Sequence, residues 1–280
     1  MILVFGKTGQ VAQELGVYKN VITLDRTQVD LKYPHACADI ILDYKPEAVI
    51  NAAAYTAVDM AEIEEEHANT INGESPGAMA HACAELKIPL VHISTDYVFN
   101  GMGEIPWQSH DKTNPQNAYG RSKLKGEQAI SRSGSSFVIL RTSWVISAQG
   151  HNFVKKMLDL SKIKDSLNVV DDQVGGPTPA RNIAKACIDI AYQLIKAPDK
   201  SGIYNFSGKP DVSWCQFANI IFRKMGRKTI ALPISTSEYQ TLAPRPLNSR
   251  FDCGSTERTF NILRPLWCNE LKEILLDLER

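Results

Sequence analysis

The sequence predicts an α/β protein built on a doubly wound parallel sheet, with a smaller lobe formed mainly by the C-terminal part of the chain. Three observations support this fold. Short apolar runs alternate with longer helical segments through the first two thirds of the chain. A glycine-rich turn follows the first apolar run, and after about residue 208 the sequence becomes irregular and rich in proline.

Length and composition are those of an ordinary globular protein. The chain has 280 residues, of which 44% are hydrophobic and 22% charged. Its 31 basic and 31 acidic residues cancel, so we expect no attraction to nucleic acid or to a membrane surface. No apolar run approaches the roughly 20 residues that span a bilayer, and no basic segment precedes the apolar run at the N-terminus, so we expect no signal peptide.

Cysteine and histidine spacing gives no sign of disulfides or of a metal site. The six cysteines are scattered without a CxxC pair, which predicts free thiols in a cytoplasmic protein. The six histidines do not pair at metal-ligand spacing, so we predict no protein-held metal.

The predicted elements alternate along the chain. Apolar runs bounded by turn residues predict strands at residues 2–5, 21–24, 48–50, 90–95, 137–141, 167–170 and 203–206. Helices are expected at residues 58–86, in two pieces broken near Asn72-Gly73, and at 119–131, 153–163, 180–195, 215–225 and 267–278. Right-handed crossovers then place helices on both faces of one parallel sheet.

The turn after the first strand has the GxxGxxA pattern of a dinucleotide site. Glycines allow the backbone to approach a pyrophosphate, and the small third residue allows the helix to pack on the strand. A triphosphate P-loop is excluded because Met1 occupies the position of its first glycine. The predicted cofactor contacts in this turn are Gly6, Lys7, Thr8, Gly9, Gln10 and Val11.

The next two strands end in residues that suit a nicotinamide dinucleotide. Asp25 is placed to bind the adenosine ribose hydroxyls of NADH, whereas Arg26 is placed to face the 2′-phosphate of NADPH, so we expect either cofactor. The third strand ends in small residues that leave room for a ligand; these predicted contacts are Asn51, Ala52, Ala53 and Ala54. A doubly wound domain that binds another ligand remains an alternative.

The residues with the clearest chemical pattern are Tyr119 and Lys123. If Asn117 caps a helix, their spacing of four puts both side chains on one face. An ammonium near a phenol favours the phenolate, so we expect Lys123 to lower the pKa of Tyr119. The strand before them ends in the hydroxyls of Ser94 and Thr95, as expected where a buried strand opens onto a site.

With these residues in order, the chain resembles the extended short-chain dehydrogenase/reductases. Finer motifs are similar to one branch, the dTDP-4-dehydrorhamnose reductases, and the likeness covers nearly the whole chain. The motifs are GKTGQV from Gly6, NAAAYTAVD from Asn51, STDYVF from Ser94, RTSWV from Arg141, Asn152-Phe153, Asp172-Gln173, GPT from Gly176 and RPLNSR from Arg245. The sequence departs from the branch at Ala12, where glycine is commoner, and at Ile146, where an aromatic residue often stands.

The resemblance implies reduction of a C4 ketone to give dTDP-L-rhamnose for cell-surface polysaccharide. It implies a Rossmann-type NAD(P)-binding domain of residues 1–143 and about 165–207, and a substrate lobe of about 144–164 and 208–280. Tyr119 is the implied proton donor, Thr95 hydrogen-bonds the same substrate oxygen, and Lys123 holds the nicotinamide ribose. The implied cofactor is NADPH or NADH, and the implied substrate a dTDP-linked keto-sugar.

The residue after Asp96 separates close relatives. Sugar-nucleotide dehydratases have a second carboxylate here, and this chain has Tyr97, which disfavours dehydration. A C4 epimerase or another sugar-nucleotide 4-ketoreductase remains an alternative. So does a non-catalytic NADP-binding protein, because the regulatory subunit of methionine adenosyltransferase resembles this branch.

Further substrate contacts are expected from the lobe. Trp144 suits stacking on a sugar or base, and the guanidinium groups of Arg245 and Arg250 suit a diphosphate. The full set of expected substrate contacts is Thr95, Asp96, Tyr97, Trp144, Asn152, Phe153, Arg245, Asn248 and Arg250. Some relatives dimerise around a divalent ion through acidic residues; Glu14 fits that pattern and Arg181 does not, so a monomer and a homodimer both remain open.

Overall fold

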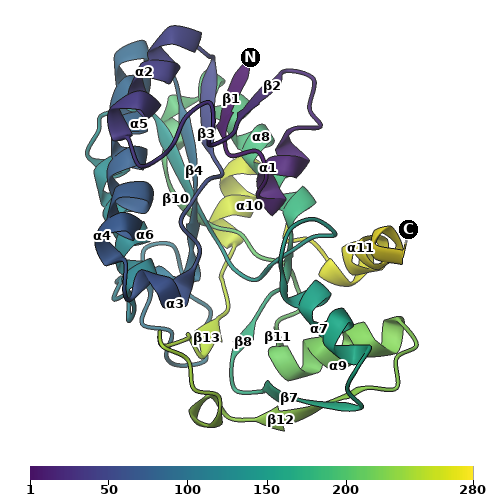
Figure 1. Cartoon of the computed structure of the whole chain (residues 1–280). Helices are drawn as coiled ribbons and strands as arrows, with labels where there is room; N and C mark the ends of the chain where they lie inside the picture. Colours follow the sequence, from purple (N-terminus) through teal and green to yellow (C-terminus); the bar gives the residue numbers. More distant parts are fainter. Residues whose placement is uncertain (280) are drawn as a thin grey trace.

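The computed structural model describes residues 1–279 and contains a six-stranded parallel sheet (Figure 1). The strand order is β10-β5-β4-β3-β1-β2, with every neighbouring pair parallel. The strands are β1 (Ile2–Phe5), β2 (Val21–Leu24), β3 (Ala48–Asn51), β4 (Leu90–Thr95), β5 (Phe137–Thr142) and β10 (Gly202–Asn205). The chain adds β2 on one side of β1 and then β3 on the other side, so the strand order reverses between β1 and β3. Folds of this kind bind their ligands at that point.

Helices cover both faces of this sheet, as predicted (Figure 1). Side chains alternate along each strand, so Ile2 and Val4 join a core with α1 (Gln10–Leu15) and α8 (Ala180–Lys196). Leu3 and Phe5 face the opposite core, to which α2 (Pro34–Tyr44) and α5 (Ser75–Leu86) contribute. Because both of its faces are buried, β1 is apolar throughout.

The helical region from residue 58 to 86 is interrupted earlier than expected. It forms α3 (Val58–Ala61), α4 (Glu65–Asn69), a π-helical turn (Thr70–Glu74) and α5. The predicted break at Asn72-Gly73 is wrong, since both residues lie inside the π turn. The Asn72 side chain bonds the backbone of Tyr55 and the hydroxyl of Ser122, so tertiary contacts hold the backbone helical there.

A second group of small sheets forms the lobe below the main sheet (Figure 1). Its strands are β6 (Val145–Ile146), β7 (Ser166–Val170), β8 (Val174–Gly175), β9 (Thr178–Pro179), β11 (Val212–Ser213), β12 (Ile230–Ile234) and β13 (Asn248–Ser249). The expectation that residues 167–170 extend the main sheet is wrong, because β7 pairs with β12 in a separate two-stranded sheet. Local sequence shows an apolar run and cannot show its partner.

The lobe has its own apolar core. It is built from α7 (Phe153–Ser161), α9 (Trp214–Lys224), α11 (Trp267–Glu279) and the strands beside them. Ser213 caps α9 in a capping box with Gln216, as the serine three residues before a glutamine suggests. One further helix, α10 (Gly254–Phe260), returns to the main sheet and packs near β10. Within residues 1–279, none of the helices has the length and apolar character needed to cross a membrane.

Candidate functional site

The glycine turn lies at the switch point between β1 and β3. Gly6 has φ +108°, a conformation that side chains rarely adopt, and a Cβ there would be 3.3 Å from the backbone of Ala52. The amide of Ala52 donates to the carbonyl of Phe5, which ties the ends of the two strands together. Glycine is therefore required where the two chain segments meet.

The start of α1 is open to a ligand. A Cβ on Gly9 would have no heavy atom within 4 Å, and Gly9 caps the helix without a side-chain hydrogen bond. The first backbone N–H groups of a helix have no partner inside the helix and favour an anion. These features fit the pyrophosphate of a dinucleotide, which the sequence pattern predicts at this turn.

Asp25 and Arg26 follow β2, beside the glycine turn. Lys7 Nζ lies 3.2 Å from Asp25 Oδ2, and Thr27 donates to Asp25 through both its amide and its hydroxyl. These hydrogen bonds, those from Thr27 first, lower the pKa of the Asp25 carboxyl to about 2. Asp25 is therefore a fixed acceptor at the end of β2, as a ribose site requires, and Arg26 is exposed next to it.

Helix α6 (Ala118–Ser131) carries Tyr119 and Lys123, and its cap is the predicted one. The Asn117 side chain accepts a hydrogen bond from the amide of Gly120. A Cβ on Gly120 would lie 2.2 Å from the carbonyl oxygen of Tyr97, so only glycine allows the short helix Asp96–Val98 to contact α6 this closely. This contact brings the end of β4 against the first turn of α6.

Tyr119 is partly buried and lies beside Thr95. Burial raises the pKa of the Tyr119 phenol to about 12, and a hydrogen bond with the Thr95 side chain acts in the opposite direction. The ring of Tyr97 lies edge-on to that of Tyr119, with centroids 5.4 Å apart. The expectation that Lys123 lowers the pKa of Tyr119 is wrong for this structure, because burial dominates and Lys123 bonds other groups.

Lys123 bonds inward to the sheet. Its Nζ lies 3.1 Å from His92 Nε2 and donates to the carbonyl of Ile93 at 2.7 Å. The other imidazole nitrogen, His92 Nδ1, lies 3.1 Å from Nδ2 of Asn51. Burial lowers the pKa of Lys123 to about 8, while the Glu127 carboxylate acts to raise it. Burial and then Lys123 hold the pKa of His92 well below its usual value, so the imidazole is neutral.

Asp96 is buried next to Thr95. Its carboxylate accepts hydrogen bonds from Thr95 Oγ1 at 3.1 Å and from Ser249 Oγ at 2.5 Å. Burial raises the pKa of Asp96 to about 6, and both hydrogen bonds oppose the rise. Ser249 belongs to β13 of the lobe, so Asp96 joins the two parts of the molecule directly behind Thr95.

A second polar pair fixes α6 on the sheet one turn beyond Lys123. Ser94 donates to Glu127 at 2.6 Å, and Arg141 of β5 binds both carboxylate oxygens of Glu127. Ser94 and Arg141 face each other in the β4–β5 register. Hydrogen bonds at His92–Lys123 and Ser94–Glu127, two residues apart on β4 and four on α6, therefore set the position of the helix.

Trp144 and Phe153 lie in an aromatic stack in the lobe. Trp144 and Trp214 are parallel with ring centroids 3.4 Å apart, and Phe153 is 4.3 Å from Trp214. Trp144 has φ +50°, which turns the chain just after β5. One face of Trp144 is thus covered by Trp214, which supports the ring from behind.

Asn152 connects the lobe to the glycine turn. Its Nδ2 donates to Gln10 Oε1 at 2.9 Å and to the Ser147 carbonyl at 2.7 Å, and its Oδ1 caps α7 at Lys155. The polar atoms of Asn152 therefore have partners within the protein. We expect replacement of Asn152 to disturb both the glycine turn and the lobe.

The polar residues of the RPLNSR segment also have partners within the protein. Arg245 Nη2 bonds Asp59 Oδ2 at 2.6 Å, and Arg245 Nη1 is buried without a hydrogen-bond partner among residues 1–279. Asn248 donates to the Ile105 carbonyl and accepts from Arg250 Nη1 at 3.1 Å. Arg245 therefore keeps an unused donor, whereas Asn248 and Arg250 bond each other.

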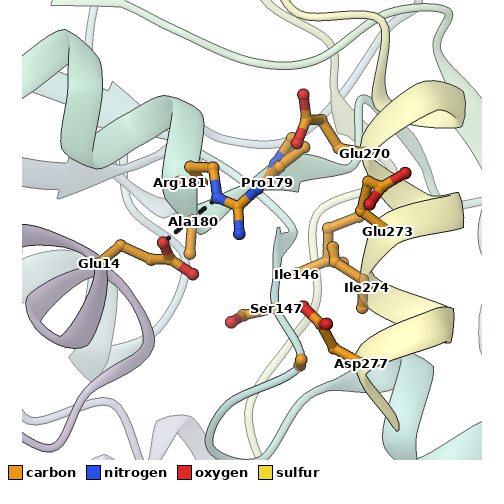
Figure 2. Close-up of a pocket in the computed structure, with 11 residues that line it drawn as sticks. Glu14, Ile146, Ser147, Pro179, Ala180, Arg181, Glu270, Glu273, Ile274 and Asp277 are labelled. Atoms are coloured by element: carbon orange, nitrogen blue, oxygen red, sulfur yellow. Dashed lines mark ion pairs between the residues drawn. The ribbon is translucent and has the colours of Figure 1, made fainter. Parts of the chain in front are cut away.

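A separate pocket lies between α1, α8 and α11, and none of its lining residues belongs to the predicted site (Figure 2). Glu14 faces Arg181 there at 3.5 Å, with Glu270 and Glu273 opposite. Arg181 supplies a positive charge at this place, as the sequence indicated. Within residues 1–279, no group of three or more metal-ligating side chains is arranged to hold an ion.

Sequence reasoning missed His92, Gly120 and Asp59 as parts of the site. His92 is a polar residue inside an apolar strand, and that signal was available. Gly120 does not stand out in the helical sequence pattern. The requirement for glycine at this position follows only from the close approach of the Tyr97 backbone. Asp59 pairs with a residue 186 positions away, which no local pattern predicts.

Comparisons with known proteins show the family to which the chain belongs. The model of the RmlD substrate binding domain family matches residues 1–280. A dTDP-4-dehydrorhamnose reductase of Sinorhizobium fredii is 43% identical over 276 residues, covering 95% of this chain and 93% of the relative.

Two solved structures are similar over essentially the full length. The crystal structure of a dTDP-4-dehydrorhamnose reductase from Clostridium acetobutylicum has a TM-score of 0.92 and 35% identity, covering 100% of this chain and 99% of that one. The corresponding protein of Bacillus anthracis, in complex with NADP, has a TM-score of 0.89 and 31% identity, covering 99% and 98%.

Proposed function

Because the chain belongs to the RmlD substrate binding domain family, whose curated relatives are dTDP-4-dehydrorhamnose reductases, we propose that it reduces dTDP-4-dehydrorhamnose to dTDP-L-rhamnose with NAD(P)H. The protein is an oxidoreductase with a Rossmann-type fold. The observation that carries the proposal is the partly buried phenol of Tyr119 beside Thr95, at the carboxyl edge of the sheet.

The site residues act on the ketone oxygen of the substrate. A nicotinamide cofactor supplies the hydride when bound, and the glycine turn, Asp25 and the open start of α1 fit it. Negative charge develops on the ketone oxygen during reduction, and a positioned acid and a hydroxyl donor stabilise it. Tyr119, with a pKa of about 12, is protonated at neutral pH and can supply this proton. The Thr95 hydroxyl hydrogen, which bonds Asp96 in the cofactor-free protein, is proposed to turn to the same oxygen.

Lys123 is proposed to bind the nicotinamide ribose. One of the three donors of an ammonium bonds the Ile93 carbonyl, and the remaining donors can serve a ribose hydroxyl. The proposed cofactor contacts are Gly6, Lys7, Thr8, Gly9, Gln10, Val11, Asp25, Arg26, Asn51, Ala52, Ala53, Ala54, Tyr119 and Lys123.

The lobe is proposed to bind the sugar nucleotide. The supported ring of Trp144 offers a stacking face, and the unused Nη1 of Arg245 suits a phosphate oxygen. Asn152, Asn248 and Arg250 make structural bonds and are proposed to act by shaping the site. We keep the domain boundaries at about residues 143 and 207. We assign the segment that contains β7 to β9 to the lobe instead of the cofactor domain, because these strands pair with strands of the lobe.

We also propose that the protein works in the cytoplasm. Its six cysteines are all free thiols, five of them buried, which suits a reducing compartment. Membrane and nucleic-acid partners are not proposed, and a monomer or homodimer is expected.

The test is optical measurement of NADPH and NADH oxidation with a panel of keto-sugar nucleotides. We expect turnover with dTDP-4-dehydrorhamnose and none with substrates that require dehydration. Binding of NADPH without any turnover by the wild-type protein would contradict the proposal and favour a regulatory role.

A further inference from the structure

A buried chain of hydrogen bonds connects the end of β3 to Lys123. It runs from the Ala53 amide to Asn51 Oδ1 at 3.1 Å and from Asn51 Nδ2 to His92 Nδ1 at 3.1 Å. It continues from His92 Nε2 to Lys123 Nζ at 3.1 Å and from Lys123 to the Ile93 carbonyl at 2.7 Å. Asn51, His92 and Lys123 are each at most 1% exposed, so water does not satisfy any of these groups.

The Ala53 amide gives this chain a direction. A backbone N–H can only donate, so the Asn51 atom that faces Ala53 is the carbonyl oxygen, and the atom that faces His92 is the NH₂ group. His92 Nδ1 must then accept. A neutral imidazole that accepts at Nδ1 carries its hydrogen at Nε2, so Nε2 donates to Lys123 Nζ.

Only an uncharged amine can accept that last hydrogen bond. An ammonium has three donors and no lone pair, and it would face the Nε2–H group donor to donor. With Lys123 as an amine, every group in the chain has a partner of the right kind, including the Ile93 carbonyl. With Lys123 as an ammonium, His92 must carry its hydrogen at Nδ1 instead, and Asn51 must give up its bond from Ala53 or share one oxygen between two donors.

We propose that His92 is a positioning residue for Lys123, and that the Asn51–His92 pair holds Lys123 as an uncharged amine in the cofactor-free protein. The inference rests on the role proposed above for Lys123. Burial lowers the pKa of Lys123 to about 8, and we expect the hydrogen-bond chain to lower it further, so that the amine is the main form at neutral pH. The charged groups near Lys123 are Glu127 on α6, which opposes this effect, and Arg141 on β5, which is paired with Glu127; Asn51 on β3 is neutral.

If Lys123 is an amine in the cofactor-free protein, binding of a dinucleotide should be accompanied by uptake of a proton by Lys123. A dinucleotide brings negative phosphates and ribose hydroxyls, which favour the ammonium over the amine. Affinity for NADPH should therefore fall as the pH rises through the pKa of Lys123. Any change that raises this pKa should move the fall to higher pH.

Asn51→Asp is the decisive variant because it reverses the direction of the hydrogen bonds from Asn51 to Lys123 with almost no change in side-chain shape. One carboxylate oxygen still accepts from Ala53, and the other can only accept from His92, so the imidazole hydrogen moves to Nδ1. His92 Nε2 then accepts from Lys123, which favours the ammonium. We expect the pKa of Lys123 to rise by about one pH unit or more, and the alkaline fall in NADPH affinity to move by the same amount.

Two measurements on cofactor-free protein test the inference directly. Nitrogen NMR of histidine-labelled protein reports the tautomer of His92, and carbon NMR of labelled lysine reports the titration of Lys123. We expect the Nε2–H tautomer in the wild type and the Nδ1–H tautomer in Asn51→Asp. An Nδ1–H tautomer or an imidazolium in the wild type would overturn the proposal.

The double variant Asn51→Asp/His92→Phe distinguishes an effect transmitted through the His92 hydrogen bonds from a through-space effect of the new negative charge. Without the imidazole, the new carboxylate acts on Lys123 only through space, so we expect its effect on the pKa to be at least about one unit smaller than with His92 present. Equal shifts in both backgrounds would show that His92 transmits nothing.

Ser94→Ala is the matched control, since Ser94 also bonds α6 from β4 but contacts Glu127 and not Lys123. We expect it to keep the wild-type pH dependence of NADPH affinity, measured by fluorescence; a shifted profile would mean that any weakening of the β4–α6 contact has this effect. Failure of the wild-type enzyme to turn over would reject the proposed function, whereas the tautomer in the cofactor-free protein decides this inference separately.

Discussion

Two arginine–carboxylate pairs in this chain have the same shortest N···O distance in different surroundings. Arg141 Nη2 lies 2.6 Å from Glu127 Oε2, and Arg245 Nη2 lies 2.6 Å from Asp59 Oδ2. Both side chains of the first pair are 2% exposed, whereas those of the second are 20% and 45% exposed. The first pair joins α6 to β5 and has further bonds to Ser94 and Ser109, while the second leaves Arg245 Nη1 without a partner.

The difference teaches that distance alone does not assign a role to an ion pair. A buried pair cannot lose one member without leaving a desolvated charge, so it acts as a fixed structural joint. A partly exposed pair is screened by water and can exchange one partner for another anion. The first pair holds the helix of Tyr119 and Lys123 in place, and the second suits a phosphate that arrives with the substrate.

The largest expected effect comes from breaking the buried pair. Glu127→Ala leaves Arg141 unpaired and should lower the free energy of unfolding by about 3–5 kcal/mol. The matched variant Asp59→Ala should cost about 1 kcal/mol or less. Chemical denaturation of both variants checks this; equal losses would remove the distinction between the two pairs.

Asp96 gives the next largest effect, and it depends on pH. Its pKa of about 6 in the folded protein exceeds the ordinary value of 3.8, so the folded state binds more protons between about pH 4 and 6. The contribution of Asp96 to stability is therefore present at low pH and is lost as the pH rises, by about 3 kcal/mol at neutral pH.

The Asp96→Asn variant should gain stability relative to wild type between pH 4 and 7, as measured by denaturation across this range. Asp25→Asn is the control, because a pKa of about 2 confines the titration of Asp25 to pH values below about 4. A flat difference for Asp96→Asn would mean that Asp96 is not buried as a carboxylate.

Removal of the partly exposed Arg245 should affect substrate binding more than stability. Arg245→Ala should raise KM for the sugar nucleotide about tenfold, because a charged hydrogen bond to a phosphate is lost, with little change in kcat. Steady-state kinetics measures both parameters, and Arg223→Ala, on the exposed surface of α9, is the control. An unchanged KM would place Arg245 with Arg141 as a structural residue.

The smallest expected effect concerns cofactor choice. Asp25→Ala removes an acceptor for the adenosine ribose hydroxyls, one of which is replaced by the 2′-phosphate in NADPH. The affinity for NADH should therefore fall about fivefold and the affinity for NADPH should fall less. Fluorescence titration with both cofactors measures the two dissociation constants. Equal losses would contradict the ribose role of Asp25.

Much of the fold followed from sequence because local and global signals agree. The strands β1 to β5 are apolar runs, and Asn117 caps α6 where its type and position indicated. The main-sheet assignment failed at β7, since an apolar strand does not encode whether its partner is β10 or β12. The break in the helices failed at Asn72, where bonds to Tyr55 and Ser122 outweigh local preference.

The site could be located from sequence, but its electrostatics could not. The spacing of Tyr119 and Lys123 placed both on α6, yet it gave the wrong sign for the pKa of Tyr119 because burial is a tertiary property. The inward bonds of Lys123 depend on the β3–β4 register that sets Asn51 opposite His92. The pairing of Arg245 with Asp59 depends on where a long loop returns.

The central claim is that Tyr119 delivers the proton to the substrate oxygen. Tyr119→Phe keeps the ring and removes only the hydroxyl, and it tests this claim most directly when kcat and the NADPH dissociation constant are measured on the same preparation. We expect a loss of at least about 10²-fold in kcat with cofactor affinity within about twofold of wild type. Unchanged turnover in this variant would contradict the claim.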